Sequence, residues 1–419
     1  MLSMEKRALA IVIFTTFLNV IGLTILIPVL PQLILEFFEP LGYDHRSSLE
    51  LLGWLNAIFP FALFFSAPIF GQLSDRYGRR PVLIFSIAGT ALGYALFAFA
   101  LVINNLPLLF FSRALDGITG GNLTIARAVV ADVSPAEHRT RNFGFLGACF
   151  GIGFIMGPYL GAHFAIPNEN FLYFFNTPSW FTTATPFWFT AALSVINMLS
   201  VYFFLPESHK KINHLAKLNW TKNLDNIRHA ATSVNLRVIY CSEFLYWSGF
   251  TFFFTFYQVF LIEKLGFKVN NSGDLYAYIG FWMVMAQLFV TPFLAKRFHN
   301  YKVLRITYLG TACALFLQLW PNNFPELLMV APFVSLFHAV SMANSTALIS
   351  LTSGPEIQGE VLGIQASLQA VAQFIPAIIA GYVATLGINL PTIIGGSLMM
   401  LGGLLFITTY SLPKRVLKE

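Results

Sequence analysis

A succession of apolar runs, each about as long as a bilayer-spanning helix, is the feature that most constrains this 419-residue chain. Charged residues make up only 11% of it, against about 25% in soluble domains, which excludes a soluble enzyme and a disordered scaffold. The sequence predicts an all-α membrane protein with twelve transmembrane helices. They are expected at residues 8–35, 51–73, 81–103, 107–133, 143–165, 183–205, 236–262, 272–295, 303–321, 326–350, 360–386 and 390–411.

The basic residues predict the orientation of these helices. Of the 25 Lys and Arg residues, twenty fall in segments on the side of the N-terminus, three in the opposite loops and two within a span. Cytoplasmic loops carry the excess of positive charge, so we expect both termini in the cytoplasm and the chain in a cell's inner (plasma) membrane. The inner loop around Glu356 and Glu360 lacks basic residues. The first span is too long for a cleavable signal peptide and runs into Pro28 and Pro31.

The longest inner loop divides the chain into predicted halves. We expect a six-helix bundle at 1–205, a cytoplasmic linker at 206–235 and a second six-helix bundle at 236–419. The linker carries apolar residues between lysines at roughly helical spacing, which favours an amphipathic helix on the headgroups, with a plain tether as the alternative. These residues are Leu215, Leu218, Trp220, Leu224 and Ile227.

The two halves resemble each other at a nearly constant offset. Residues 80–91 are similar to 302–312, and Pro135 through Gly144 is similar to Pro355 through Gly363. Six helices followed by six with the same sense form a parallel, pseudo-symmetric repeat. Transporters built in this way bind substrate between the halves, near the membrane midplane.

A polar loop after the second span carries the most specific motif. It has the spacing G-x-L-x-D-R-x-G-R-R, in which glycines permit close approach and a tight turn, and the charges can pair at the inner surface. Its residues are Gly71, Asp75, Arg76, Gly78, Arg79 and Arg80. This spacing resembles the signature loop of the major facilitator superfamily, and the resemblance implies the major facilitator fold and a gating role for the loop.

Three further motifs support the same resemblance. Arg113-x-x-Asp116-Gly117 is similar to the family's R-x-x-Q-G motif, with aspartate in place of glutamine. The fifth span resembles the antiporter motif of proton-coupled efflux members, and its last glycine is replaced by Ala162. The first span resembles that of twelve-span drug/proton antiporters of the tetracycline-exporter type, with Asn19 in place of an aspartate. In the fifth span, Gly144, Gly153, Gly157 and Gly161 clear a packing face and Pro158 bends the helix, which suits a gate.

Two carboxylates within predicted spans are the candidates for proton coupling. Asp116 lies roughly 14 Å from the outer end of the fourth helix, with Arg113 one turn away, and a structural ion pair is the alternative. Gly117, Gly120, Thr124 and Arg127 continue the same face. Glu243 lies about 10 Å into the seventh helix from the inside. Its face continues through Trp247, Phe250, Phe254 and Tyr257, with Gln258 beside them.

The aromatic face of the seventh helix suits an apolar or cationic substrate, but with 45 phenylalanines in the chain, lipid contact or core packing is equally open. The resemblance places helices 1, 2, 4, 5, 7, 8, 10 and 11 around a central cavity. The predicted cavity residues are Asn19, Asn56, Arg113, Trp247, Tyr257, Gln258, His338, Gln365 and Gln369. Asp132, at the inner end of the fourth helix, is expected to pair with Arg79 or Arg80 and to close an inner gate together with Gly153, Gly157 and Pro158.

These features predict a secondary transporter that works by alternating access and exports an amphipathic small molecule, such as a drug or a siderophore, in exchange for protons. Proton-coupled uptake of a nutrient or siderophore is the alternative, as is a substrate sensor or lipid-handling protein on the same fold. No phosphate-binding loop, nucleophile–base pair or metal spacing is visible, so we expect no cofactor, no metal and no enzymatic activity. The expected partners are a small molecule, protons and the lipid bilayer, without nucleic acid, and a monomer is expected.

Overall fold

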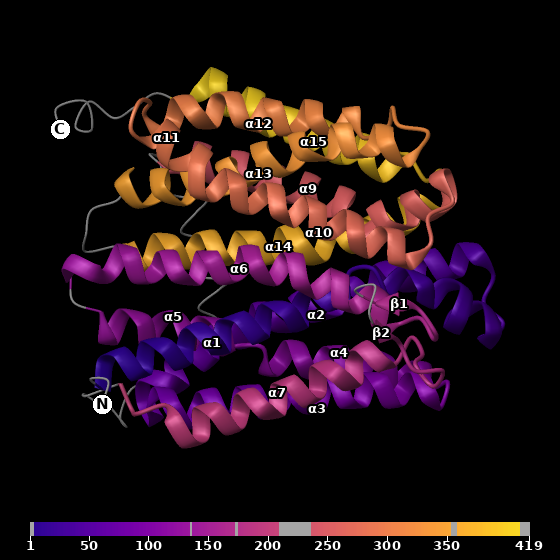
Figure 1. Ribbon diagram of the computed structural model, residues 1–419. Helices are drawn as coiled ribbons and strands as arrows, with labels where there is room; N and C mark the ends of the chain where they lie inside the picture. The colour runs from indigo at the N-terminus through magenta and orange to yellow at the C-terminus, as the bar shows by residue number, and fades with distance from the viewer. Residues whose placement is uncertain (1–3, 135, 172–174, 209–235, 353–357, 411–419) are drawn as a thin grey trace. The chain divides into compact units, whose positions relative to one another are not determined.

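The computed structural model describes residues 4–134, 136–171, 175–208, 236–352 and 358–410. In this part of the chain nearly all regular structure is helical (Figure 1). The helices before the linker are α1 (Met4–Ile25), α2 (His45–Tyr77), α3 (Arg79–Val102), α4 (Leu106–Thr119), α5 (Asn122–Val133), α6 (Ala136–Phe164) and α7 (Thr185–Phe204). Those after it are α9 (Arg237–Leu265), α10 (Val269–Met285), α11 (Thr291–Ala295), α12 (Asn300–Leu317), α13 (Phe324–Thr352), α14 (Gln358–Ala384) and α15 (Leu390–Thr409).

The predicted all-α membrane class is confirmed. Ten helical stretches of the described residues are long and apolar enough to cross a membrane. Two predicted spans are not among them. The span at 303–321 corresponds to α12, which carries Lys302 and Arg305 in its first turns. The span at 107–133 is two shorter helices, α4 and α5, which are separated at Gly120 and Gly121.

Other helix ends follow from local chemistry. The first helix ends at Ile25 and not at the predicted residue 35, because Pro28 and Pro31 cannot continue its hydrogen bonds, and a 3-10 turn η1 (Leu30–Gln32) and a π-helix η2 (Ile34–Phe38) follow. A further 3-10 turn, η3 (Glu39–Leu41), leads to α2. At the start of α2 the Asp44 carboxylate accepts a hydrogen bond from the Ser47 backbone N–H at 3.1 Å. Between α10 and α11 lies a second π-helix, η4 (Ala286–Val290).

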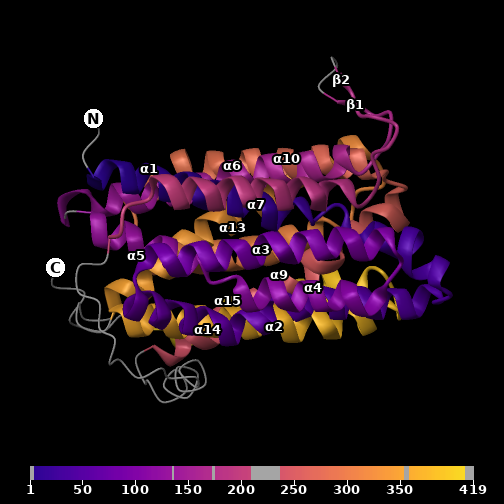
Figure 2. The same cartoon turned by 90° about the horizontal axis from the view of Figure 1, so that it is seen from below.

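The chain divides into two compact units. Unit 1 comprises residues 1–48, 58–220 and 268–278, and unit 2 comprises residues 49–57, 221–267 and 279–419. In unit 1, α1 packs on α5, α6 and α7, and α3 packs on α4, α5 and α7 (Figure 2). The core between them is built from aliphatic residues such as Val12, Leu83, Ile125 and Val129. The connection from α6 to α7 contains the short paired strands β1 (Asn170–Phe171) and β2 (Phe175–Asn176).

Unit 2 is organised around α9, which packs on α13, α14 and α15. Helices α9 and α15 approach so closely at Gly249 and Gly395 that a Cβ atom on either residue would collide with the backbone carbonyl of the other. Helix α12 packs on α13 and α15 (Figure 1). The predicted amphipathic segment of the linker, from Leu215 to Ile227, lies outside the described residues.

Candidate functional site

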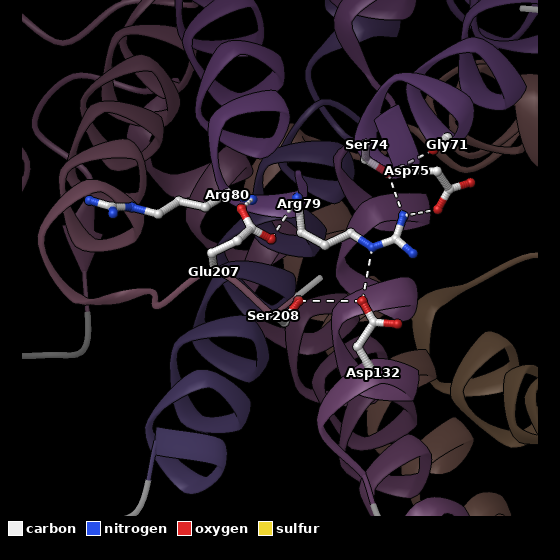
Figure 3. A network of polar contacts seen from close by, with 8 residues as sticks. All are labelled: Gly71, Ser74, Asp75, Arg79, Arg80, Asp132, Glu207 and Ser208. Atoms are coloured by element: carbon white, nitrogen blue, oxygen red, sulfur yellow. Dashed lines mark hydrogen bonds and ion pairs between the residues drawn. The ribbon is translucent and has the colours of Figure 1, made fainter. Parts of the chain in front are cut away.

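The signature loop forms a compact charge cluster at the turn between α2 and α3 of unit 1 (Figure 3). Gly78 makes the turn with φ of +102°, a conformation that L side chains rarely adopt. The turn directs the Arg79 side chain toward the end of α5, where its Nε donates to Asp132 Oδ2 at 3.0 Å. Of the two arginines expected to pair with Asp132, Arg79 therefore makes the contact. Arg80 points away from it and donates to the Tyr202 carbonyl.

Arg79 is nearly buried, and its guanidinium is held by two further groups. Its Nη1 donates to Ser74 Oγ at 2.7 Å and lies 2.5 Å from Asp75 Oδ1. Ser74 in turn donates to the Gly71 carbonyl at 2.7 Å. Arg76 packs over the Tyr77 ring at 5.2 Å and takes part in none of the ion pairs among the described residues.

Glu207 completes this cluster, and the sequence reasoning missed it. Its two carboxylate oxygens accept hydrogen bonds from the backbone N–H groups of Arg79 at 2.9 Å and Arg80 at 3.1 Å. A carboxylate at this position stabilises the positive end of α3. The next residue, Ser208, donates to Asp132 Oδ2 at 3.4 Å. The chain leaving α7 is thus attached to the α2–α3 turn (Figure 3). The acidic residue that follows Pro206 at the end of the sixth span was the available signal.

The expected ion pair in the fourth segment is present, deep within unit 1. Arg113 Nη1 lies 3.3 Å from Asp116 Oδ2, and the two side chains are 8% and 5% exposed. The Arg113 guanidinium also lies over the Phe59 ring at 4.8 Å from its centroid. Asp116 packs closely against Gly93 of α3, where an added Cβ atom would lie only 3.0 Å from the Cβ atom of Asp116. Arg113 and Asp116 are therefore paired in charge inside the unit, while the buried Arg113 Nε has no hydrogen-bond partner among the described residues.

The break between α4 and α5 is stabilised by hydroxyl groups from neighbouring helices. Ser66 of α2 donates to the Gly117 carbonyl at 2.8 Å, and Ser86 of α3 donates to the Thr119 carbonyl at 2.5 Å. These carbonyls lie where the helical hydrogen-bond ladder is interrupted, and a non-helical backbone at membrane depth requires such partners. At the start of α5, Asn122 Nδ2 donates to Asn19 Oδ1 of α1 at 3.1 Å. The predicted cavity residue Asn19 is thus used in a helix-to-helix contact.

The second carboxylate, Glu243, occupies a cluster of neutral donors in unit 2. Its Oε1 accepts hydrogen bonds from Gln365 Nε2 at 2.5 Å, Gln369 Nε2 at 3.2 Å and Ser345 Oγ at 2.9 Å. Its Oε2 is buried and makes no hydrogen bond of ordinary geometry with the described residues, although Trp247 lies close enough to act on the carboxyl group. The structure therefore brings together Glu243, both predicted glutamines and Trp247.

An aromatic column continues from this cluster along α9. Tyr246 shares a hydrogen bond of 2.8 Å with His338 Nδ1, and it stacks on Tyr308 with ring centroids 4.5 Å apart. His338 lies against the face of Phe250 at 3.8 Å. His338 is therefore enclosed by aromatic rings and buried in the fold.

Other predicted cavity residues are used elsewhere. The Tyr257 hydroxyl donates to Gln318 Oε1 at 2.8 Å, roughly 21 Å along α9 from Glu243. Its neighbour Gln258 is also buried. The Asn56 amide donates to the Leu52 carbonyl of its own helix at 2.9 Å. None of these three contacts the Glu243 cluster in the described hydrogen bonds.

The antiporter motif of α6 packs directly on α1. A side chain at Gly153 would collide with Val20, and one at Gly157 would collide with Thr24. The Thr24 hydroxyl donates to the Gly153 carbonyl at 3.0 Å, so the glycine stripe is both a steric and a polar contact. On another side of α6, Ala162 and the Pro158 carbonyl lie against Gly273 of α10 in the same unit.

No group of three or more His, Cys, Asp or Glu side chains that could hold a metal is found in the described part of the chain. The candidate residues thus form separate groups: the charge cluster and the Arg113–Asp116 pair in unit 1, and Glu243 with its amide donors and aromatic column in unit 2.

The chain is similar to known proteins in sequence and in fold. The pattern of the Major Facilitator Superfamily matches residues 12–375 and 239–419. The class E tetracycline resistance protein of Escherichia coli is 30% identical over 377 residues, which covers 87% of this chain and 84% of that protein.

Two solved structures have a similar fold. The human organic anion transporter MFSD10 has a TM-score of 0.71 at 24% identity, over 96% of this chain and 99% of that one. A D-xylose–proton symporter has a TM-score of 0.78 at 16% identity, over 98% of both chains.

Proposed function

Because the chain belongs to the Major Facilitator Superfamily and is a transporter of the drug-exporter type rather than an enzyme, we propose that it exports an amphipathic small molecule in exchange for protons. The direction is supported by the similarity to tetracycline resistance proteins over most of both chains. The fold alone does not set the direction, since a proton symporter and an organic anion transporter share it.

The environment of Glu243 is the observation that carries the proposal. It is a buried carboxyl group whose hydrogen-bond partners are neutral, so its ionised form has no counter-ion among those partners. A buried charge without a counter-ion is costly, which ties the protonation of such a group to conformations that expose or enclose it. Glu243 is therefore the main proposed proton-coupling residue.

Asp116 is the second proposed coupling residue, with Arg113 as its partner. An ion pair inside the membrane can separate when a proton or a charged substrate replaces one partner, and the break between α4 and α5 lies within one turn of it. Asn19, Arg113 and Trp247, together with Gln365 and Gln369, are proposed to face the substrate during the cycle.

Alternating access is proposed to involve rocking of the bundles at 1–205 and 236–419. The charge cluster at Gly78, Arg79 and Asp132 would hold the inner end of the first bundle rigid. The glycine stripe of α6 would serve as a sliding surface against α1. We further propose a monomer in the inner (plasma) membrane with both termini in the cytoplasm, in line with the distribution of basic residues.

The test is transport by the purified protein in proteoliposomes with an imposed pH gradient. The panel contains lipophilic cations, tetracyclines, siderophores and amino acids, and proton movement is followed with an internal pH dye. Substrate movement opposite to the proton supports the proposal. Movement in the same direction would identify an importer, and exchange of lipid without proton movement would identify a lipid-handling protein.

Variants then test the coupling residues. Glu243→Gln is expected to abolish pH-driven transport while substrate exchange without a gradient persists, because the amide imitates a permanently protonated acid. Glu5→Gln, which removes an exposed carboxylate in the first turn of α1, is the matched control and should transport normally. Asp116→Asn is compared with the double variant Arg113→Gln/Asp116→Asn. The comparison separates the effect of an arginine left without its counter-ion from the effect of a lost proton site. Full coupled transport in Glu243→Gln would remove Glu243 from the mechanism.

A further inference from the structure

Arg127 is an unusual residue for a membrane-spanning segment. It lies on α5, whose packed face is formed by Ile125, Ala126, Val129 and Val130, all at most 1% exposed in the core of unit 1. Arg127 is on the other face, and both it and Thr124, one turn away, are exposed. Arginine inside a membrane segment is costly against lipid and almost always faces protein or a water-filled space.

Four other arginines of this unit have partners, and Arg127 has none among the described residues. Arg79 and Arg113 form ion pairs, whereas Arg7 and Arg80 donate to carbonyl groups. For Arg127 the described residues offer no hydrogen bond, ion pair or ring contact. An unpaired cation kept at membrane depth needs a binding partner to offset its cost.

The helix that carries Arg127 adds two further features. First, α5 begins at Asn122, at the break in the fourth segment, and the N-terminal end of such a half-helix is electropositive. Second, Arg127 lies about 7.5 Å along the axis from that end, and helical side chains lean toward the N-terminus, so the guanidinium can approach it. Thr124 supplies a hydroxyl on the same face, and Gly71 of α2 leaves space beside it, with a Cβ position 3.8 Å from Thr124 Cγ2.

We propose that Arg127 and Thr124 bind an anionic group of the transported molecule, such as a carboxylate or a sulfonate. This inference rests on the proposed export function and names the charge of its substrate. The planar guanidinium offers paired N–H donors that match the two oxygens of a carboxylate. Asp116, the acid on the preceding helix, is paired with Arg113, whereas the Arg127 charge is paired with no described residue.

The test measures binding directly and requires no turnover. The full-length protein in nanodiscs is titrated with 6-carboxyfluorescein, an anion, and with rhodamine 123, a cation built on the same three-ring scaffold. Fluorescence anisotropy gives the dissociation constants. Arg127→Gln is expected to weaken 6-carboxyfluorescein binding on the order of 10- to 100-fold, the range expected for a lost hydrogen bond to a charged group. Arg127→Lys keeps the charge and should recover most of the affinity.

Arg46→Gln, which removes the same charge from the first turn of α2, is the matched control and should bind 6-carboxyfluorescein like the wild type. The apparent melting temperature of each variant shows that it is folded, and 6-carboxyfluorescein should raise it for the wild type and not for Arg127→Gln. Tighter binding of rhodamine 123 than of 6-carboxyfluorescein by the wild type would overturn the proposal. Equal binding of 6-carboxyfluorescein by wild type and Arg127→Gln would overturn it as well.

The outcome is separable from that of the proposed function. Proton-coupled export of rhodamine 123 without any binding of 6-carboxyfluorescein would leave the exporter standing and overturn the anion site. Arg127-dependent binding of 6-carboxyfluorescein without proton exchange would support the site and contradict the proposed coupling. Slower transport of both dyes by Arg127→Gln, at unchanged affinity, would mean that Arg127 acts on the conformational change and would also overturn the site.

Discussion

In the charge cluster at the α2–α3 turn, Arg79 forms two ion pairs, and we predict that solvent exposure and not distance decides which contributes more to stability. Arg79 is 3.0 Å from Asp132 and 2.5 Å from Asp75, so distance alone favours Asp75. The Asp75 side chain is 55% exposed, however, whereas that of Asp132 is 23% exposed and that of Arg79 only 8%. Water and salt screen the first pair far more than the second.

The expected free energies follow from this difference. The exposed Arg79–Asp75 pair should contribute about 0–1 kcal/mol to the free energy of unfolding. The Arg79–Asp132 hydrogen bond, between charged and mostly enclosed groups, should contribute about 1.5–3 kcal/mol. Asp75 and Arg79 are also neighbours on the local sequence, so part of their attraction persists in an unfolded state that keeps helical structure.

A pair of double-mutant cycles measures both interactions. Arg79→Gln is combined with Asp132→Asn in one cycle and with Asp75→Asn in the other, and unfolding is followed by SDS titration in mixed micelles. The coupling free energy should be larger for Asp132 by at least about 1 kcal/mol. A coupling to Asp75 equal to or above that of Asp132 would refute the reasoning, because it would show that distance and not exposure sets the strength of these pairs.

Three further predictions rest on single contacts; the first two use the same unfolding assay, and the third uses the melting temperature. Gly78→Ala should lower the free energy of unfolding by about 1–3 kcal/mol, since φ is +102° there, and an unchanged value would contradict the strained turn. Gly157→Ala should lower the free energy of unfolding by about 1–3 kcal/mol, because the added methyl group overpacks against α1. Gly147→Ala, with open space around its Cβ position, should be neutral or slightly stabilising. Equal effects of the two substitutions would count against tight packing of the glycine stripe. Hydrogen bonds from the Ser47 hydroxyl and backbone N–H hold the pKa of Asp44 below its ordinary value of 3.8. The ionised cap therefore stabilises the fold fully above pH 3.8, and this contribution is lost as the pH falls through the lower pKa of the folded state. Asp44→Asn should keep the cap and remove this acid dependence of the melting temperature.

The membrane fold was largely predictable because hydropathy and helix length are local properties. The break between α4 and α5 was not, although the glycine pair at 120 and 121 was visible. A pair of glycines inside an apolar run is compatible with a continuous helix. What stabilises the break is the pair of hydroxyl groups on α2 and α3, Ser66 and Ser86, which lie 51 and 33 residues from their acceptors. Hydrogen bonds between separate helices leave no trace in periodicity.

The sequence predicted which residues belong to the candidate site better than it predicted the contacts between them. Asp132 was expected to pair with Arg79 or Arg80 because of the family resemblance and of their similar predicted depth in the membrane, and the structure contains the pair with Arg79. Glu243, Gln365 and Gln369 were each selected as polar residues on apolar helices, but their convergence on one carboxylate oxygen depends on how α9 and α14 pack. On the tenth span, the Ser345 hydroxyl makes the contact with Glu243, whereas the amide of the neighbouring Asn344 donates to the Val340 carbonyl of its own helix.

A loss of transport has a different interpretation in the neutral variants of the two buried acids, Glu243 and Asp116. Glu243 accepts three hydrogen bonds on Oε1, which leaves Oε2 as the atom for a proton, and an amide placed with its nitrogen at Oε2 preserves those three contacts. Loss of coupling in Glu243→Gln therefore reports on the proton. Asp116→Asn instead leaves the buried Arg113 without its counter-ion, a change that costs about 3–5 kcal/mol in comparable buried pairs. Loss of transport in that variant has two causes, which only the additional removal of the Arg113 charge separates.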